Sequence, residues 1–218
     1  MSGICRLVFA MLGAAAIALA GGATAADPAV RSKPAILVYG DSLSAEYGLA
    51  RGTGWAALLE QRLRQQAADY SVVNASISGE TTAGGASRIA AELARVRPAV
   101  VIIELGGNDG LRGLALTATR ANLETMITAA KAAGARVVLC GMQLPPNYGR
   151  DYTQQFRELY GALARAHGVA LVPFFLDGIA ERRELFQPDG IHPGTDAQPR
   201  ILDNVWPVLA PLLKPRRR

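Results

Sequence analysis

Hydrophobic residues form short runs of strand length that alternate with helical patterns along most of the chain. The runs expected to be strands are 35–39, 70–74, 99–105, 136–141 and 170–173. The segments expected to be helices are 55–68, 85–94, 120–133, 153–167 and 201–213, the last interrupted by Pro207 and Pro211. Strand–helix alternation through a whole chain predicts an α/β domain, with a parallel sheet and helices on both of its faces.

The N-terminal segment has the pattern of a signal peptide. An apolar run, 7–20, follows Arg6, and Ala23-Thr24-Ala25 fits the small-x-small cleavage pattern. The run is short for a membrane anchor. We expect residues 1–25 to be removed between Ala25 and Ala26, which predicts export to the periplasm or the outside of the cell. A single domain is then expected over 26–213, followed by a basic tail, 214–218.

Charge and cysteine usage restrict the classes of partner. The net charge is +5, and loss of the leader with Arg6 leaves +4, which equals the charge of the 214–218 tail. The near-neutral body predicts no nucleic-acid partner, and the tail is a candidate for transient contact with an anionic membrane surface. Cys140 is the one cysteine left after processing, so no internal disulfide is expected. It ends an apolar run and is interpreted as a buried hydrophobic residue.

Three loops that follow the first three predicted strands carry groups suited to acyl transfer. They are Gly40-Asp41-Ser42-Leu43, Ser78-Gly79-Glu80-Thr81-Thr82 and Gly106-Gly107-Asn108-Asp109. The carboxyl ends of parallel strands meet at one rim of the sheet. Ser42 offers a hydroxyl nucleophile there. The Gly79 N–H and the Asn108 amide offer donors for a developing oxyanion.

A fourth segment, Asp189-Gly190-Ile191-His192, supplies a base and a carboxylate. The spacing of three lets Asp189 reach Nδ1 of His192 across one turn, and Nε2 of His192 would take the proton of Ser42. The other histidine, His167, ends a helix with no partner nearby in the sequence, and is interpreted as a favourable charge at a helix C-terminus.

Each motif alone is an ordinary turn signal. Their joint placement at one rim favours chemistry. A phosphate-binding loop at Gly79–Gly85 is disfavoured, because Gly85-Ala86 stands where that motif requires Lys-Ser/Thr. An α/β-hydrolase is also disfavoured, since Ser42 lacks the Gly-x-Ser-x-Gly elbow.

With these residues in place, the sequence resembles the GDSL, or SGNH, hydrolase superfamily. The name-giving residues match at Ser42 in GDSLS, Gly79 in SGETT, Asn108 in GGND and His192 in DGIHP. Nearly all of the chain after the expected signal peptide is similar to the bacterial periplasmic acyl-CoA thioesterase I, arylesterase and lysophospholipase branch. The resemblance implies a three-layer, flavodoxin-like fold with a five-stranded parallel sheet. It also implies Ser42, Asp189 and His192 as the triad, the Ser42 N–H, Gly79 and Asn108 as the oxyanion hole, and no metal or cofactor.

The resemblance predicts a serine esterase that cleaves aryl esters, short- to medium-chain acyl esters, lysophospholipids and acyl thioesters through an acyl-enzyme. Candidate acyl-contacting residues are Leu111, Leu114, Leu116, Leu144, Pro145, Pro146 and Tyr148. Some of these residues are equally well explained by packing against neighbouring helices. A carbohydrate O-deacetylase and a noncatalytic binding module are the alternatives. One departure from the family pattern is Glu46, where many relatives have glycine. The oligomeric state is left open.

Overall fold

The structure is a computed structural model that describes residues 33–66 and 68–213. The strands are β1 (Ala35–Gly40), β2 (Ser71–Asn74), β3 (Val100–Glu104), β4 (Arg136–Cys140) and β5 (Ala170–Val172). The α-helices are α1 (Trp55–Gln65), α2 (Thr82–Val96), α3 (Gly107–Leu111), α4 (Leu116–Ala132), α5 (Arg150–His167) and α6 (Gln198–Leu209). Single 3₁₀ turns are η1 (Pro146–Tyr148), η2 (Arg183–Leu185), η3 (Thr195–Ala197) and η4 (Ala210–Leu212). The predicted strands are all present, to within one or two residues at their ends.

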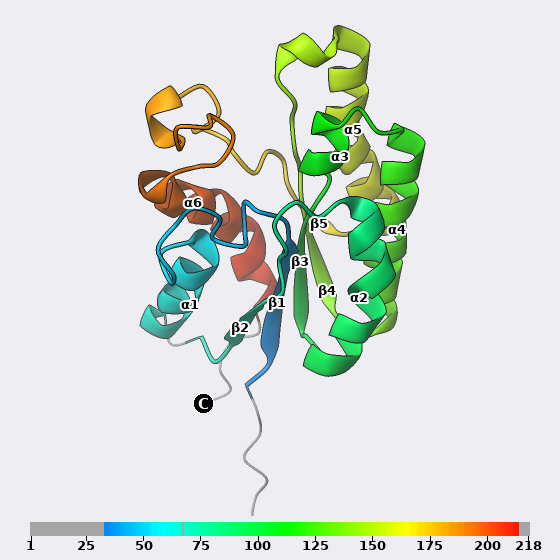
Figure 1. The fold of residues 1–218 in the computed structure, drawn as a ribbon. Helices are drawn as coiled ribbons and strands as arrows, with labels where there is room; N and C mark the ends of the chain where they lie inside the picture. The colour runs from blue at the N-terminus through cyan, green and yellow to red at the C-terminus, as the bar shows by residue number, and fades with distance from the viewer. Residues whose placement is uncertain (1–32, 67, 214–218) are drawn as a thin grey trace, which may run out of the picture. The chain divides into compact units, whose positions relative to one another are not determined.

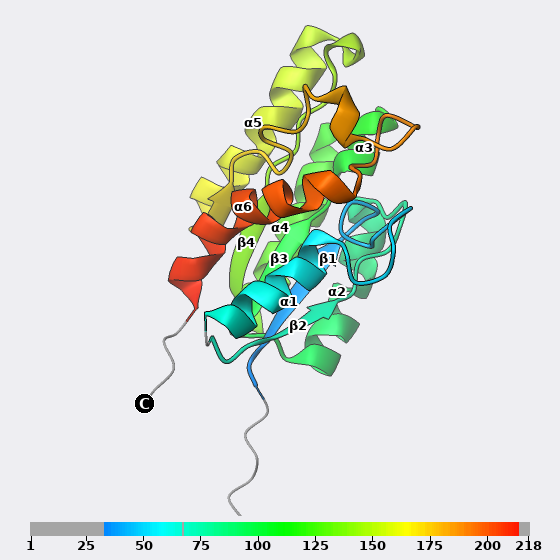
Figure 2. The same cartoon turned by 90° about the vertical axis from the view of Figure 1, so that its left-hand side faces the viewer.

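The strands form one parallel sheet in the order β2-β1-β3-β4-β5. Helices α1 and α6 cover one face, while α2, α4 and α5 cover the other, as the two views in Figures 1 and 2 show. This arrangement confirms the predicted three-layer α/β fold with a five-stranded parallel sheet.

The hydrophobic core explains why strands β1 and β3 could be recognised from sequence. Every residue of β1 and every residue of β3 is buried, because these strands lie in the middle of the sheet and are covered by helices on both faces. The edge strand β2 is only partly buried and accordingly has a weaker apolar pattern. Cys140 is fully buried at the end of β4, as expected of a small hydrophobic side chain.

Helix α2 begins at Thr82, three residues before its predicted start, in spite of two glycines that weaken helix propensity. Packing explains why Gly85 is there. Its carbonyl accepts a hydrogen bond of 2.7 Å from the Tyr39 hydroxyl, and a Cβ on Gly85 would come within 2.6 Å of the Leu105 side chain. The glycine therefore lets α2 approach the sheet closely, a tertiary effect that local pattern does not reveal.

Helix α6 also differs from its expected bounds. It starts at Gln198, with Pro199 in its first turn where a missing N–H is harmless, and it continues through Pro207. It ends two residues after Pro207, and Pro211 lies in the separate turn η4. None of the helices in the described ranges has the length and apolar character required to cross a membrane.

The topology brings distant loops together. After β1 the chain runs outward to β2 and then returns to the other side of β1 to form β3. The loops after β1 and β3 therefore border a crevice at the carboxyl end of the sheet, where ligands bind in open α/β sheets.

Candidate active site

Ser42 lies on a tight turn that leaves the carboxyl end of β1. The amides of Ser44 and Ala45 donate to the Asp41 carbonyl at 3.2 and 2.9 Å, and the Leu43 amide donates to Oδ1 of Asp41 at 3.0 Å. These bonds reverse the chain directly around Ser42. Its hydroxyl is consequently presented at the rim of the sheet and is not packed inside it.

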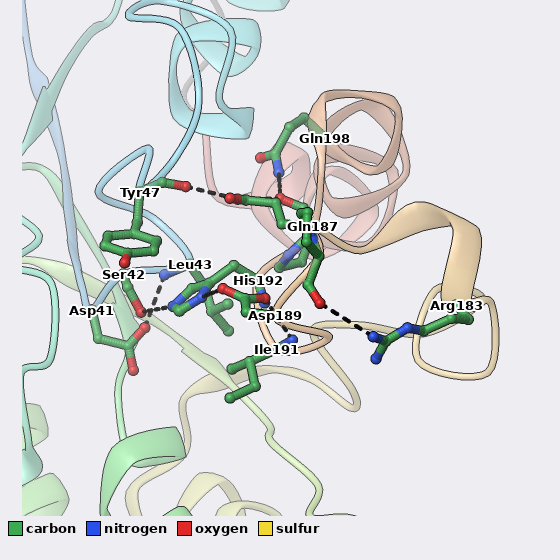
Figure 3. Close-up of polar contacts among 12 residues, drawn as sticks. Asp41, Ser42, Leu43, Tyr47, Arg183, Gln187, Asp189, Ile191, His192 and Gln198 are labelled. Carbon is green, nitrogen blue, oxygen red and sulfur yellow. Dashed lines mark hydrogen bonds and ion pairs between the residues drawn. The ribbon is translucent and has the colours of Figure 1, made fainter.

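His192 reaches Ser42 from the segment between η2 and η3, 150 residues further along the chain. Its Nε2 is 3.0 Å from Oγ of Ser42, and its Nδ1 is 2.7 Å from Oδ2 of Asp189 (Figure 3). Hydroxyl, imidazole and carboxylate therefore form a continuous hydrogen-bonded series. With Nδ1–H donating to Asp189, Nε2 is left to accept the proton of Ser42.

The backbone of the same turn holds the Asp189 carboxylate in place. Oδ1 accepts from the amides of Ile191 at 2.9 Å and His192 at 3.0 Å. These donors, together with the His192 ring, lower the pKa of Asp189 to about 2. Gly190, which lies between Asp189 and Ile191, has a φ of +69°, a conformation that L side chains rarely adopt. Asp189 is therefore ionised at any pH near neutrality and oriented toward Nδ1.

Two glutamines attach this turn to the rest of the domain. Nε2 of Gln187 donates to the carbonyls of Tyr47, at 2.8 Å, and Pro193, at 3.3 Å (Figure 3). Gln198 is buried at the start of α6, where Oε1 accepts from the Trp55 amide at 3.0 Å and Nε2 donates to the Pro193 carbonyl at 3.4 Å. The position of His192 is thus tied to the start of α1 and to the loop that carries Ser42.

Tyr47 contacts the imidazole from the Ser42 side. The rings of Tyr47 and His192 have centroids 4.4 Å apart at an angle of 39°. The preceding residue, Glu46, has a φ of +59°, in the left-handed region that favours glycine. Its carboxylate accepts from the amides of Gly52, at 3.0 Å, and Gly54, at 2.8 Å, so this side chain fastens the loop that a glycine would leave without such bonds.

The three predicted oxyanion donors lie in the expected loops. In the described residues, the backbone amides of Ser42 and Gly79 donate to no protein acceptor. Gly79 has a φ of +77°, so its backbone conformation, and not a crowded neighbour, requires glycine. Nδ2 of Asn108 lies 3.0 Å from both Oδ2 of Asp41 and the Glu80 carbonyl. Asn108 would have to share or exchange one of these bonds to donate to an oxyanion.

Asp41 is buried beneath the nucleophile turn and differs sharply from Asp189. Burial raises its pKa to about 6, against the lowering effect of hydrogen bonds from the Leu43 amide and Asn108. Asp109, also buried, accepts from the Thr82 amide at 2.9 Å and from the Thr82 hydroxyl. Asp109 therefore fixes the start of α2 to helix α3, a structural task that the Gly-Asn-Asp motif alone does not reveal.

A cavity of about 960 Å³ opens beside the Ser42–His192 pair. Of the predicted acyl-contacting residues, Leu111, Leu144, Pro145 and Pro146 line it. Its size is at the upper end of the range usual for small-molecule sites. Within residues 33–66 and 68–213, no group of three or more histidine, cysteine, aspartate or glutamate side chains is arranged to hold a metal ion.

The family assignment rests on a match over most of the domain. Residues 38–198 match the family described as GDSL-like Lipase/Acylhydrolase. The chain belongs to this family. The match spans the loop of Ser42 and the turn of His192, so it includes all four of the segments that meet at the rim.

Named relatives of this GDSL-like acylhydrolase agree with the match. It is 56% identical to Esterase TesA of Pseudomonas aeruginosa over 178 residues, which are 82% of this chain and 89% of the relative. It is 43% identical to Thioesterase 1/protease 1/lysophospholipase L1 of Escherichia coli, with 82% and 84% of the two chains covered. A crystal structure of TesA superposes with a TM-score of 0.80 at 55% identity, covering 82% of this chain and 99% of the other. The protein is a carboxylic ester hydrolase.

Three of the interpretations of single residues in this GDSL-like hydrolase need adjustment. Tyr148 does not line the cavity, and its hydroxyl donates to the Leu111 carbonyl at 3.2 Å. Leu116 packs against the core, which was the alternative explanation for such residues. His167 ends α5 as predicted, but Nε2 lies 3.1 Å from Oε1 of Glu124 on α4, so a distant residue provides the partner that its sequence neighbours lack.

Sequence reasoning missed one wall of the cavity. Phe174, Leu176 and Ala180, from the loop after β5, also line it. These residues have no recognisable motif. Their position after a parallel strand was the available signal, because the rim rule that placed Ser42 and Asn108 applies equally to the loop after β5.

Proposed function

We propose that this GDSL-like hydrolase is a serine esterase that cleaves carboxylic esters and acyl thioesters through an acyl-enzyme on Ser42. The observation that supports the proposal best is the pair of distances at His192: 3.0 Å from Nε2 to Oγ of Ser42 and 2.7 Å from Nδ1 to Asp189. Both lie within hydrogen-bonding range, and the order nucleophile, base, carboxylate is the one that general-base activation of a hydroxyl requires.

The proposed reaction has two halves. Oγ of Ser42 attacks the carbonyl carbon of the ester while Nε2 of His192 takes the hydroxyl proton. When the tetrahedral intermediate collapses, the bond to the leaving alcohol or thiol breaks and His192 returns the proton to it. A water molecule then attacks the acyl-enzyme, again giving a proton to Nε2, and that proton passes back to Ser42 as the carboxylic acid leaves. Asp189 remains ionised throughout and stabilises the imidazolium.

Charge on the substrate oxygen develops close to the Ser42 amide. The unpaired N–H groups of Ser42 and Gly79 are the natural donors, because they need give up no existing bond. Nδ2 of Asn108 is the third proposed donor. Its bond to the Asp41 carboxylate holds the amide in position before substrate arrives.

The proposed substrates are aryl esters, short- to medium-chain acyl esters and lysophospholipids. Leu111, Leu144, Phe174 and Leu176 offer an apolar wall that suits an acyl chain. The exposed large hydrophobic side chains of the described residues also lie at the carboxyl end of the sheet, in loops or at the end of α3, namely Tyr47, Ile77, Leu111, Leu114 and Ile191. The name of the Escherichia coli relative includes both thioesterase and lysophospholipase, which supports this range.

Kinetics with chromogenic esters test the proposal. Ser42→Ala and His192→Ala are expected to lower kcat for para-nitrophenyl esters by about 10⁴-fold or more, with the folded structure intact by circular dichroism. Full turnover by Ser42→Ala would contradict the assignment. A panel that compares acetylated sugars with medium-chain esters and lysophosphatidylcholine decides between an esterase and the alternative O-deacetylase, since the apolar wall predicts preference for the acyl chains.

Export remains part of the proposal. The expected signal peptide, 1–25, and the basic tail, 214–218, fall outside the described residues. The expectation depends on the charge, length and Ala-x-Ala pattern of the sequence. N-terminal sequencing of the protein recovered from a periplasmic extract should begin at Ala26, and recovery only of chains that begin at Met1 would contradict it.

A further inference from the structure

Glu104, the last residue of β3, is fully buried directly below the nucleophile turn. Its Oε2 accepts a hydrogen bond of 2.6 Å from the Ser44 hydroxyl, and the Asp41 amide points to the same oxygen at 3.4 Å. Ser44 and Asp41 flank Ser42 in sequence. One carboxyl group therefore contacts the turn on both sides of the nucleophile.

The surrounding packing fixes this carboxyl group in place. Gly40 pairs with Glu104 across the β1–β3 ladder, and a Cβ on Gly40 would lie 2.5 Å from Oε2. Nε1 of Trp55 donates to Oγ of Ser44 at 3.1 Å, and Nδ2 of Asn74 donates to the Ser44 carbonyl at 2.7 Å. Glu104 is thus one member of a buried polar network that links β1, β2 and β3 to the start of α1.

The charge environment of Glu104 favours an uncharged acid. No lysine, arginine or histidine forms an ion pair with it in the described parts of the chain, and its Oε1 is buried without a hydrogen-bond partner. The titratable groups that face it are Asp41 from the nucleophile turn, Cys140 from β4 and Tyr160 from α5, all of them neutral or negative. A buried carboxylate without a cation is strongly disfavoured.

The direction of its pKa agrees with this environment. Burial raises the pKa of Glu104 well above the usual range, and the nearby Asp41 charge raises it further, against the lowering effect of the Ser44 hydrogen bond. A raised pKa in a buried carboxyl favours the protonated, uncharged form, as in other sites where an apolar environment maintains a neutral acid.

We propose that Glu104 is a positioning residue for the esterase reaction, an uncharged carboxylic acid that holds Ser44 and the Asp41 amide and thereby aims Ser42 at His192. The inference rests on the proposed role of Ser42 as nucleophile. Glu104 does not touch the substrate; it acts through the turn. Its loss would let Oγ of Ser42 move relative to Nε2, and small displacements of a nucleophile are costly to the chemical step.

The test compares Glu104→Gln and Glu104→Ala with the wild type and with Glu158→Gln, which removes an exposed carboxylate of α5. Glutamine reproduces the shape and the neutral state. For a soluble para-nitrophenyl ester we expect Glu104→Gln and Glu158→Gln to keep kcat within about threefold of the wild type. Glu104→Ala should lower kcat by about 100-fold with little change in KM, because only the geometry of attack is affected.

A spectroscopic arm measures the protonation state directly. At about pH 8, above the Asp41 pKa of about 6, the infrared carbonyl stretch of a protonated carboxylic acid should be present in the wild type and in Glu158→Gln and absent from Glu104→Gln. This arm and the glutamine kinetics decide the question even if Glu104→Ala does not fold.

Three results would overturn the inference: no protonated-acid band in the wild type, a loss of kcat of about 100-fold in Glu104→Gln, or full kcat in a folded Glu104→Ala. In each of these cases an inactive Ser42→Ala would leave the proposed function standing. An active Ser42→Ala would instead remove the proposed function, and the two failures are therefore distinguishable.

Discussion

Two carboxyl groups near Ser42 have opposite environments, and their chemistry follows from that difference. Asp189 is partly exposed and receives two backbone N–H bonds, which lower its pKa to about 2. Asp41 is buried below the turn, and burial raises its pKa to about 6. Asp189 thus keeps its charge at every pH near neutrality, whereas Asp41 changes its charge just below neutrality.

Asp41→Asn should change how stability depends on pH. A raised folded-state pKa gives the wild type stability that is fully present below the unfolded pKa of 3.8 and lost as pH rises through about 6. Asparagine does not titrate. Between about pH 4 and pH 7 the free energy of unfolding of the wild type should therefore fall by about 2 kcal/mol relative to Asp41→Asn.

Urea denaturation of both proteins at several pH values measures this difference directly, because titrations that the two proteins share cancel. Asparagine also places an amide where Oδ2 accepts from Asn108, so a constant loss of stability at all pH values is expected in addition. The prediction concerns the slope. A difference that does not vary between about pH 4 and pH 7 would contradict the raised pKa of Asp41.

Asn108 is the proposed oxyanion donor that already has acceptors, and its contribution is measurable. Asn108→Ala should lower kcat by about 100- to 1,000-fold with a smaller change in KM, because the donor acts on charge that develops in the transition state. Asn122→Ala is the matched control. It removes a side-chain amide on α4 that donates to the Thr82 hydroxyl on α2, and it should keep kcat. Equal kcat for Asn108→Ala and the wild type would remove Asn108 from the oxyanion hole.

At the level of elements, the site depends on turns whose backbone conformations are unusual. Gly190 at a φ of +69° allows the Asp189–His192 turn to close on its own carboxylate. Glu46 at a φ of +59° begins the loop that carries Tyr47 to the imidazole. In each turn a carboxylate accepts backbone N–H bonds: Asp189 from Ile191 and His192, and Glu46 from Gly52 and Gly54.

Gly190→Ala tests the turn against a matched glycine. Alanine at a positive φ costs about 1 kcal/mol, and a Cβ on Gly190 would also collide with the Arg183 guanidinium. Gly134 has a φ of +80° and nothing within 4 Å of its Cβ position, in the α4–β4 connection at the opposite end of the sheet. Both variants should lose about 1 kcal/mol or more in stability.

The two glycine variants should separate in activity. Gly190→Ala is expected to lower kcat by about 10- to 100-fold as His192 is displaced from Ser42, while Gly134→Ala keeps kcat. Ester kinetics and thermal unfolding on the same samples provide both readouts. Unchanged kcat in a Gly190→Ala protein that has lost stability would show that this turn does not control the position of the imidazole.

Strands and most helices were predictable from sequence because their apolar periods reflect direct burial. The start of α2 was not, since Gly84 carries no helical signal and the close approach of Gly85 to the sheet is a tertiary contact. The short helix α3 follows a glycine-rich turn and has no apolar period to detect. At the site, Ser42, Gly79, Asn108 and His192 were found by their motifs, but the buried partners of the turn, Glu104 among them, were not.

In the domain as a whole, the parallel sheet brings the loops of the site together. The order β2-β1-β3-β4-β5 places the loops after β1, β2 and β3 side by side at one rim. The polypeptide after β5 then passes back over this rim and places His192 3.0 Å from a serine 150 positions earlier in the sequence. The sequence predicted this convergence because parallel strands present all their carboxyl ends on the same side.

Covalent labelling tests most directly the claim that Ser42 is a nucleophile activated by His192. The intact protein is treated with a fluorophosphonate, and the adduct is mapped by peptide mass spectrometry. We expect one phosphonylated residue, Ser42, with labelling abolished in Ser42→Ala and slowed by about 100-fold or more in His192→Ala. An adduct on a different residue, or labelling of Ser42 at an unchanged rate in a folded His192→Ala protein, would contradict it.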